Sequence, residues 1–277
     1  MAKTIVLTGA SDGIGAAAAR RLASDGYRVV VVGRSREKTL AVAKDIHAES
    51  FVADFSRLDD VRRLADDLLK VCPRIDVLAN NAGLISGSQR CVTGDGHELT
   101  LQVNYLAPFL LNHLLADRLA ESRATVIHTS SMAHWSSRLD LGDLEHTRSY
   151  SPMGAYSDSK AAILLHTREL QRRAGDQGVT AVAFHPGVVR TNFAHEAWGA
   201  ISWVYTSPLR YLLPTTAAQG ADTLVFLAEG TPGVDFPPGR YLIRRREART
   251  RSFVSDPSLA KALWRATEAT LGITAAW

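Results

Sequence analysis

The sequence predicts an α/β protein, in which a single domain is built on a doubly wound parallel sheet with helices on both faces. Three observations lead to this fold class. Short apolar runs rich in β-branched residues alternate with segments of helical periodicity, which is the pattern of βαβ units. A glycine-rich turn joins the first apolar run to an alanine-rich helix. Polar residues follow the ends of several apolar runs, where ligands meet a parallel sheet.

The composition is that of a globular chain with a core of its own. Its 277 residues are 46% hydrophobic, so we expect one domain over 1–277 that needs neither a disulfide nor a metal for stability. Cys72 and Cys91 match no metal-binding spacing and suggest reduced thiols. No apolar run approaches the ~20 residues of a membrane span, and the start of the chain leaves no room for a signal peptide. We therefore expect a cytoplasmic protein with no integral membrane segment.

The expected strands are short and apolar, and most are rich in β-branched residues. They occupy residues 4–7, 27–32, 50–53, 75–79, 124–128, 179–184 and 237–243, the last as an edge strand. The expected helices have high helical propensity or apolar residues at helical spacing. They cover residues 16–23, 37–45, 58–71, 97–119, 156–165, 215–227 and 259–271. Connections between parallel strands are right-handed, which distributes the helices over both faces.

The glycine-rich turn has both flanks that a dinucleotide fingerprint requires, a strand before it and a helix after it. Its glycines would let the backbone approach a pyrophosphate, and the helix N-terminus offers free N–H groups. The candidate cofactor contacts in this turn are Gly9, Ser11, Asp12, Gly13, Ile14 and Gly15. The alternative is a tight turn that binds no ligand.

The end of the second strand bears on the choice of cofactor. A dinucleotide site usually carries an acidic residue about 20 residues on, which binds the ribose 2′-hydroxyl. Arg34 stands there instead, followed by Ser35. A cation suits a 2′-phosphate, so NADP(H) is favoured over NAD(H). Asp12 argues mildly against this preference, and a solvated loop charge is the alternative role for Arg34.

Tyr156 and Lys160 lie four residues apart at the start of an alanine-rich helix, so their side chains share one face. A phenol beside an ammonium is a tunable acid, because the positive charge lowers the tyrosine pKa from its ordinary value of ~10. Such a pair can protonate a carbonyl oxygen or take a proton from an alcohol. The alternative is a surface contact between the two side chains.

Together these features resemble the short-chain dehydrogenase/reductase family over about residues 3–241. The shared motifs are Thr8-Gly9-x-x-x-Gly13-x-Gly15, Asp54, Asn80-Asn81-Ala82-Gly83, Asn104, Ser131, Tyr156-x-x-x-Lys160 and Pro186-Gly187. The resemblance implies a Rossmann-type fold and an oxidoreductase that uses NADP(H) to interconvert a ketone or aldehyde and an alcohol. The gap between Ser131 and Tyr156 is about twice the usual length, as in the branch of retinol dehydrogenase-like proteins and carbonyl reductases. The extra loop could instead be plain packing over the sheet edge.

The resemblance also implies roles for individual residues. Tyr156 would be the general acid or base, and Lys160 would bind the nicotinamide ribose. Ser131 would bind the substrate oxygen and Asn104 would hold a relay water. Ser130 is the alternative to Ser131, and capping of a neighbouring backbone group is the alternative role for Asn104. The further cofactor contacts would be Asp54, Phe55, Asn81, Ala82, Gly83, Tyr156, Lys160, Pro186, Gly187, Val189 and Thr191.

Residues 192–214 are rich in aromatic and aliphatic side chains. The family resemblance implies a substrate lid here and therefore a bulky apolar carbonyl or alcohol substrate. Alternatives are a helix pair packed on the core or on a second subunit, or a membrane-surface helix, so we leave a monomer or homo-oligomer open. We expect no nucleic-acid partner, because no binding motif accompanies the net charge of +4. The basic run 244–251 is expected to be solvated, with a partner patch as the alternative.

Further alternatives concern function and the histidines. The competing functions are a non-catalytic NADP(H)-binding sensor or scaffold, and a nucleic-acid or anionic-surface binder that uses Arg244, Arg245 and Arg246. We expect His128, within a strand, to be structural, and His134 to lie in a loop or to contact the substrate.

Overall fold

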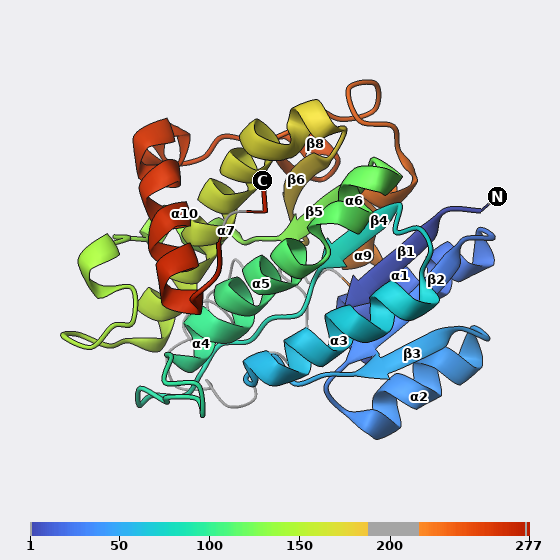
Figure 1. Ribbon diagram of the computed structural model, residues 1–277, viewed down its shortest axis with the longest axis horizontal. Coiled ribbons are helices and arrows are strands. Elements are labelled where there is room, and N and C mark those ends of the chain that lie inside the picture. Colours follow the sequence, from blue (N-terminus) through green and yellow to red (C-terminus); the bar gives the residue numbers. More distant parts are fainter. Residues whose placement is uncertain (1, 188–215, 275) are drawn as a thin grey trace.

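An eight-stranded sheet forms the centre of the protein (Figure 1). The computed structural model describes residues 2–187, 216–274, 276 and 277. The strands lie in the order β3-β2-β1-β4-β5-β6-β7-β8. Their bounds are β1 (Thr4–Thr8), β2 (Arg28–Gly33), β3 (Glu49–Val52), β4 (Val77–Asn80), β5 (Thr125–Thr129), β6 (Thr180–His185), β7 (Tyr241–Ile243) and β8 (Arg246–Glu247). All neighbouring pairs are parallel except β7 with β8.

The strand order reverses beside β1. The chain adds β2 and β3 on one side of β1, and then continues on the other side with β4, β5 and β6. The carboxyl ends of β1 and β4 therefore border the crevice in which open α/β sheets bind ligands. The predicted doubly wound, mostly parallel sheet is confirmed.

Helices cover both faces because successive strand residues point to opposite sides. In β1, Val6 belongs to one core cluster, whereas Ile5 and Leu7 belong to the other. The first cluster packs beneath α3 (Leu58–Val71), α5 (Ala107–Leu114), α7 (Pro152–Ala174) and α10 (Pro257–Leu271). The second packs against α1 (Gly13–Ser24), α2 (Arg36–Asp45) and α9 (Ala217–Glu229). Figure 1 shows α3, α5 and α7 crossing the same face, with α10 beside α7.

The helix predicted over 97–119 is interrupted. It consists of α4 (Leu99–Leu101), a π-helical turn η1 (Gln102–Leu106), α5, and α6 (Ala116–Ser122). Within the π-helical turn the N–H of Ala107 bonds to the carbonyl of Gln102, five residues earlier. A π-helical turn inside a helix is uncommon and often occurs at a functional site. The predicted unbroken helix is therefore wrong, and Asn104 lies in the irregular turn.

The last strands also differ from the prediction. β7 is shorter than 237–243, and it is not the edge strand because β8 pairs with it. Arg244 and Arg245 form the connection, with φ angles of 49° and 63° in the left-handed region. The basic run is thus partly structured, and Arg245 forms an ion pair with Asp222 of α9.

None of the helices in the described ranges is long and apolar enough to cross a membrane. Four short 3-10 turns complete the described structure: η2 (Met132–Ser136), η3 (Leu141–Asp143), η4 (Gly175–Gln177) and η7 (Ser252–Ser255). The lid predicted over 192–214 and the cofactor contacts predicted at Val189 and Thr191 lie outside the described residues.

Candidate active site

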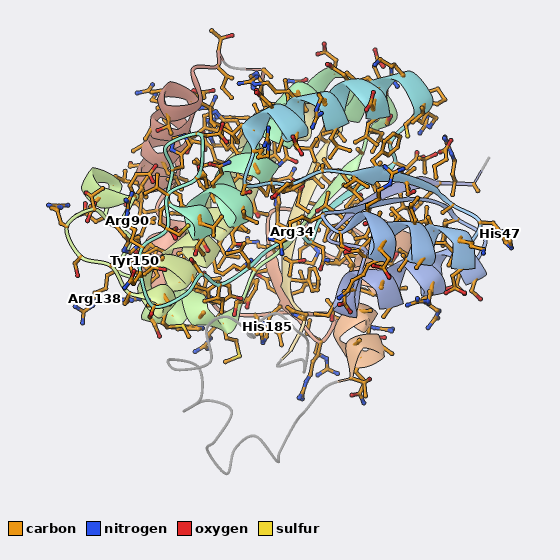
Figure 2. The ribbon with its side chains drawn as sticks, turned by 90° about the horizontal axis from the view of Figure 1, so that it is seen from below. Arg34, His47, Arg90, Arg138, Tyr150 and His185 are labelled. Atoms are coloured by element: carbon orange, nitrogen blue, oxygen red, sulfur yellow. The ribbon has the colours of Figure 1, made fainter. Side chains whose placement is uncertain are left out.

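A cleft of about 800 Å³ lies at the carboxyl ends of the parallel strands. It brings together segments that are distant in sequence, and Figure 2 labels Arg34 and His185, two of the residues in its wall. The predicted site residues that line it are Gly9, Ser11, Asp12, Gly13, Ile14, Gly15, Arg34, Ser35, Asp54, Phe55, Asn81, Ala82, Gly83, Ser131, Tyr156, Lys160, Pro186 and Gly187. Asn104 is fully buried just behind this wall.

The glycine-rich turn has no room for side chains at two positions. Gly9 has a φ of +64°, and a Cβ there would lie 2.7 Å from the Cα of Ala82. A Cβ on Gly15 would lie 2.2 Å from the carbonyl oxygen of Gly9. The backbone of β1, the turn and the β4 loop therefore touch directly. This glycine-rich cradle leads into the N-terminus of α1, where backbone N–H groups suit the approach of a pyrophosphate.

Asp12 caps α1 and bears on the cofactor question. Its Oδ1 accepts a hydrogen bond of 2.7 Å from the N–H of Gly13, and its Oδ2 accepts one of 2.7 Å from Lys38. The carboxylate is thus paired with a cation of α2. This pairing reduces the repulsion that Asp12 would exert on a phosphate.

Asn81 and Thr8 fix the ends of three neighbouring strands. The hydroxyl of Thr8 accepts hydrogen bonds from the N–H groups of Asn81 and Ala82, and donates to the carbonyl of Ala79. The amide of Asn81 donates to the carbonyl of Thr8 and accepts from the hydroxyl of Thr129 on β5. Thr8 was not among the predicted site residues, although its place at the end of the first strand could have indicated this role.

Tyr156 and Lys160 share one face of α7, as the spacing predicts. The Lys160 Nζ lies 5.4 Å from the centroid of the Tyr156 ring and donates a 3.1 Å hydrogen bond to the carbonyl of Thr129. Burial lowers the pKa of Lys160 from 10.5 to about 7, since the charged ammonium loses its hydration. Near neutral pH the positive charge beside Tyr156 is therefore smaller on average than that of an exposed lysine.

Asn104 is held by the backbone of the loop after β4. Its Nδ2 donates to the carbonyl of Leu84 at 2.9 Å and to the hydroxyl of Ser159 at 3.0 Å, and its Oδ1 accepts from the N–H of Leu84. These contacts agree with the alternative, capping role. Gly83 lies between this amide and the Lys160 ammonium. A Cβ added to Gly83 would lie 3.2 Å from Asn104 Oδ1 and 3.4 Å from Lys160 Nζ. Asn104 is thus close to the ammonium even though it does not line the cleft.

The two candidate serines have different environments. Ser130 is buried, and its hydroxyl donates a 3.0 Å hydrogen bond to the carbonyl of Lys160. Ser131 is half-buried in the cleft wall, and its Oγ accepts a 3.1 Å hydrogen bond from the N–H of Ala133. The acceptor role leaves the hydroxyl proton of Ser131 available for a substrate oxygen. This geometry favours Ser131.

His128 belongs to a buried polar network behind the site. The amide of Asn112 lies 3.1 Å from its Nε2 and 2.9 Å from the Nε2 of His166. Burial, together with the charge of Lys160, lowers the pKa of His128 to about 3, so the ring is neutral. A structural position for this histidine agrees with the prediction.

Two other histidines differ in their relation to the cleft: His134 lies behind its wall and His185 is part of it. His134 lies in the connecting turn η2, as one of the two expectations had it, but its ring is fully buried and absent from the cleft wall, so the expected substrate contact has no support. His185 ends β6 and lines the cleft, where burial lowers its pKa to about 4. Its place after an apolar strand and before Pro186-Gly187 is the signal that could have indicated a site residue.

The extra loop between Ser131 and Tyr156 is packed. Leu139, Leu141 and Leu144 contact the core cluster beneath α3, α5 and α7. Asp158 of α7 accepts hydrogen bonds from the Ser137 hydroxyl and the Arg138 N–H. Arg90, Arg138 and Tyr150, labelled in Figure 2, mark this side of the molecule, where Arg90 donates to the Glu145 carbonyl and Tyr150 to that of Gly87. The loop is therefore packed on the core, which agrees with the alternative of plain packing, and only its first residues, up to Ser136, and Met153 at the start of α7 line the cleft in the described part of the chain.

The described part of the cleft wall combines backbone groups with polar side chains. No group of three or more histidine, cysteine, aspartate or glutamate side chains there could hold a metal ion. The cleft offers glycine backbone, a phenol, an amine and hydroxyls, which suit a nucleotide and an oxygen-bearing substrate.

Comparison with known proteins agrees with this geometry. The family model described as short chain dehydrogenase matches residues 3–200. The chain is 41% identical to "Putative daunorubicin C-13 ketoreductase DnrU" of Streptomyces sp. (strain C5), covering 99% of this chain and 94% of that protein. It is 34% identical to retinol dehydrogenase 13 of Homo sapiens, covering 99% of this chain and 86% of that protein. Both relatives agree with the predicted branch.

Solved structures give the same result. The chain has a TM-score of 0.79 and 33% identity with a Mycobacterium paratuberculosis protein, covering 98% of this chain and 94% of the other. A short chain dehydrogenase from Burkholderia cenocepacia J2315 in complex with NADP has a TM-score of 0.70 and 28% identity, covering 87% of this chain and 95% of the other. The fold, the matched family model and these relatives lead to one conclusion: the chain belongs to the short-chain dehydrogenase/reductase family of oxidoreductases, which act on carbonyl and alcohol groups.

Proposed function

We propose that this protein is an NADP(H)-dependent oxidoreductase that interconverts a ketone or aldehyde and an alcohol on a bulky apolar substrate. The observation that carries the proposal is the convergence of Tyr156, Lys160 and Ser131 on one cleft that also contains the glycine-rich cradle. A non-catalytic sensor or scaffold would not require this convergence.

NADP(H), when bound, supplies or accepts the hydride. The backbone of the glycine-rich turn and the N-terminus of α1 would hold the pyrophosphate. The Tyr156 hydroxyl would donate its proton to the carbonyl oxygen, and Ser131 would orient that oxygen by a hydrogen bond. Lys160 would bind the nicotinamide ribose, with Asn104 supporting the loop beside it. Asp54, Asn81, Pro186 and the undescribed Val189 and Thr191 would complete the cofactor contacts.

A panel of bulky ketones with NADPH, followed by the loss of cofactor absorbance, tests the reaction. Tyr156→Phe should fold, bind NADPH and lose turnover by about 10²–10⁴-fold, the usual contribution of a positioned general acid. Tyr150→Phe is the matched control, because that phenol bonds to the Gly87 carbonyl and is not in the cleft wall. Substantial turnover by Tyr156→Phe would refute the role given to that hydroxyl.

The preference for NADP(H) is supported by Arg34. Its side chain is exposed in the cleft wall beside Ser35 and Lys38, at the end of β2. A charge-assisted hydrogen bond contributes about 1.5–3 kcal/mol, so Arg34→Asp should weaken NADPH binding by roughly 10–150-fold and spare NADH. Arg36→Asp changes the charge equally at an exposed position outside the cleft wall and is the control. Equal losses for NADPH and NADH would remove Arg34 from this role.

The apolar substrate is supported by four apolar side chains in the cleft wall. Leu84, Ile85, Met132 and Met153 line the cleft and offer hydrocarbon and thioether surface. Residues 192–214 would add a lid. Two relatives are named for a ketoreductase and a retinol dehydrogenase, which is in line with bulky substrates. A kcat/KM that rises from acetone to retinoid-like, steroid-like or aryl ketones would support the proposal, and a flat series would contradict it.

A further inference from the structure

In the turn that follows β5, hydrogen bonds hold both the hydroxyl and the backbone carbonyl of Ser131. The Oγ of Ser131 accepts a hydrogen bond from the N–H of Ala133. The carbonyl oxygen of Ser131 lies 2.7 Å from the Nδ1 of His134 and also accepts a 3.3 Å hydrogen bond from the backbone N–H of that residue. A carbonyl can only accept, so Nδ1 carries the proton in this contact.

The imidazole of His134 is itself fixed. It is fully buried, and its ring packs edge-on against Tyr241 of β7, with centroids 5.3 Å apart at 79°. Its Nε2 is buried and has no hydrogen-bond partner among the residues that the structure describes. The bond to the Ser131 carbonyl is therefore the ring's one side-chain hydrogen bond within these residues. Burial also lowers the pKa of His134, which favours the neutral ring that this geometry needs.

From this geometry we infer that His134 is a positioning residue, which sets the Ser131 hydroxyl by holding the Ser131 carbonyl against the wall formed by β7. The inference rests on the proposed function, because it concerns the hydroxyl that would orient the substrate oxygen. His134 itself would touch neither substrate nor cofactor, since the ring is buried and absent from the cleft wall.

The chemistry of the ring allows a matched pair of substitutions. In His134→Asn the amide nitrogen can occupy the place of Nδ1 and donate to the same carbonyl, whereas in His134→Gln it reaches the place of Nε2 instead. Both variants remove the aromatic ring and introduce a neutral amide. A purely structural role would therefore make the two variants similar in activity as well as in Tm.

The experiment compares kcat, KM and Tm of the wild type, His134→Asn and His134→Gln with NADPH and one bulky ketone. We expect kcat of His134→Asn to stay close to the wild type and kcat of His134→Gln to fall by about 10–100-fold, the cost of a misplaced group at a reacting centre. The KM for NADPH of both variants should stay close to that of the wild type. The two variants should also have similar Tm values. Equal kcat values for the two variants would overturn the inference.

A double-mutant cycle shows whether the effect passes through the serine. In a Ser131→Ala background, His134→Gln should lower kcat no further, because the hydroxyl to be positioned is gone. An undiminished loss in that background would also overturn the inference.

A final measurement does not depend on turnover. The ¹⁵N chemical shifts of His134 in the wild-type protein should report the Nδ1–H tautomer at pH 7. An Nε2–H tautomer would overturn the inference even if the enzyme were active. Absence of turnover by the wild type with every carbonyl in the panel would instead refute the proposed function.

Discussion

Replacement of Lys160 by methionine should change the pH dependence of stability in a way that can be worked out from the structure. The ammonium is buried, and its pKa falls from 10.5 to about 7. At 1.36 kcal/mol per pKa unit, this difference corresponds to about 5 kcal/mol of folding free energy. Methionine keeps much of the length and removes the charge.

The sign follows from proton binding. Below pH 7 the amine is charged in both states, and its burial costs the folded protein the full amount. Between pH 7 and 10.5 the unfolded chain holds a proton that the folded chain has lost, so the stability of the wild type rises with pH. The variant lacks this contribution. It also loses the hydrogen bond to the Thr129 carbonyl, at a cost of about 1–3 kcal/mol.

Lys160→Met should therefore be more stable than the wild type by about 2–4 kcal/mol at pH 6.5 and less stable by about 1–3 kcal/mol near pH 10.5. Urea unfolding without cofactor, followed by tryptophan fluorescence at four pH values over this range, measures the difference. Lys70→Met is the control at an exposed lysine, and its curve should parallel that of the wild type. A parallel curve for Lys160→Met would show that the folded-state pKa is near 10.5 and would refute the reasoning.

Two further substitutions probe the surroundings of the site. Gly83→Ala introduces a Cβ at 3.2 Å from Asn104 Oδ1 and 3.4 Å from Lys160 Nζ. Because these groups would be displaced, kcat should fall by about 10-fold or more, while Tm stays close to that of the wild type. Unchanged kinetics would contradict the close packing. Asn112→Ala removes the donor shared by two buried imidazoles. The free energy of unfolding measured in urea should therefore fall by about 2–5 kcal/mol. A fall below about 1 kcal/mol would mean that the network is not needed for stability.

Much of the fold could be predicted because its determinants are local. The four consecutive valines of β2 are all buried, as an internal parallel strand requires, and a run of that composition has few other uses. The spacing of Tyr156 and Lys160 likewise specifies one helix face whatever the rest of the chain does. The valines therefore predict the sheet, and the Tyr156–Lys160 spacing predicts the centre of the candidate site.

Other features depend on contacts that no local pattern reveals. The π-helical turn adds one residue to a helix without disturbing its apolar character, so 97–119 looked continuous. The depressed pKa of Lys160 arises from burial under segments that are distant in sequence. His134 looked available because it follows a serine pair in a loop-like stretch, whereas a 3-10 turn directs it into the protein. β8 is only two residues long, too short to be recognised, and so β7 was taken for the edge.

The additional residue in the turn at 102–106 has a consequence for how this helix tolerates change. Each helical residue rotates the chain by about 100°, so excision of one residue here would restore a regular ladder and turn the preceding stretch by that angle. The amide of Asn104 would then face away from Leu84 and Ser159, the two neighbours it joins. A fully regular helix at this place would therefore break the link that Asn104 makes between the loop after β4 and α7.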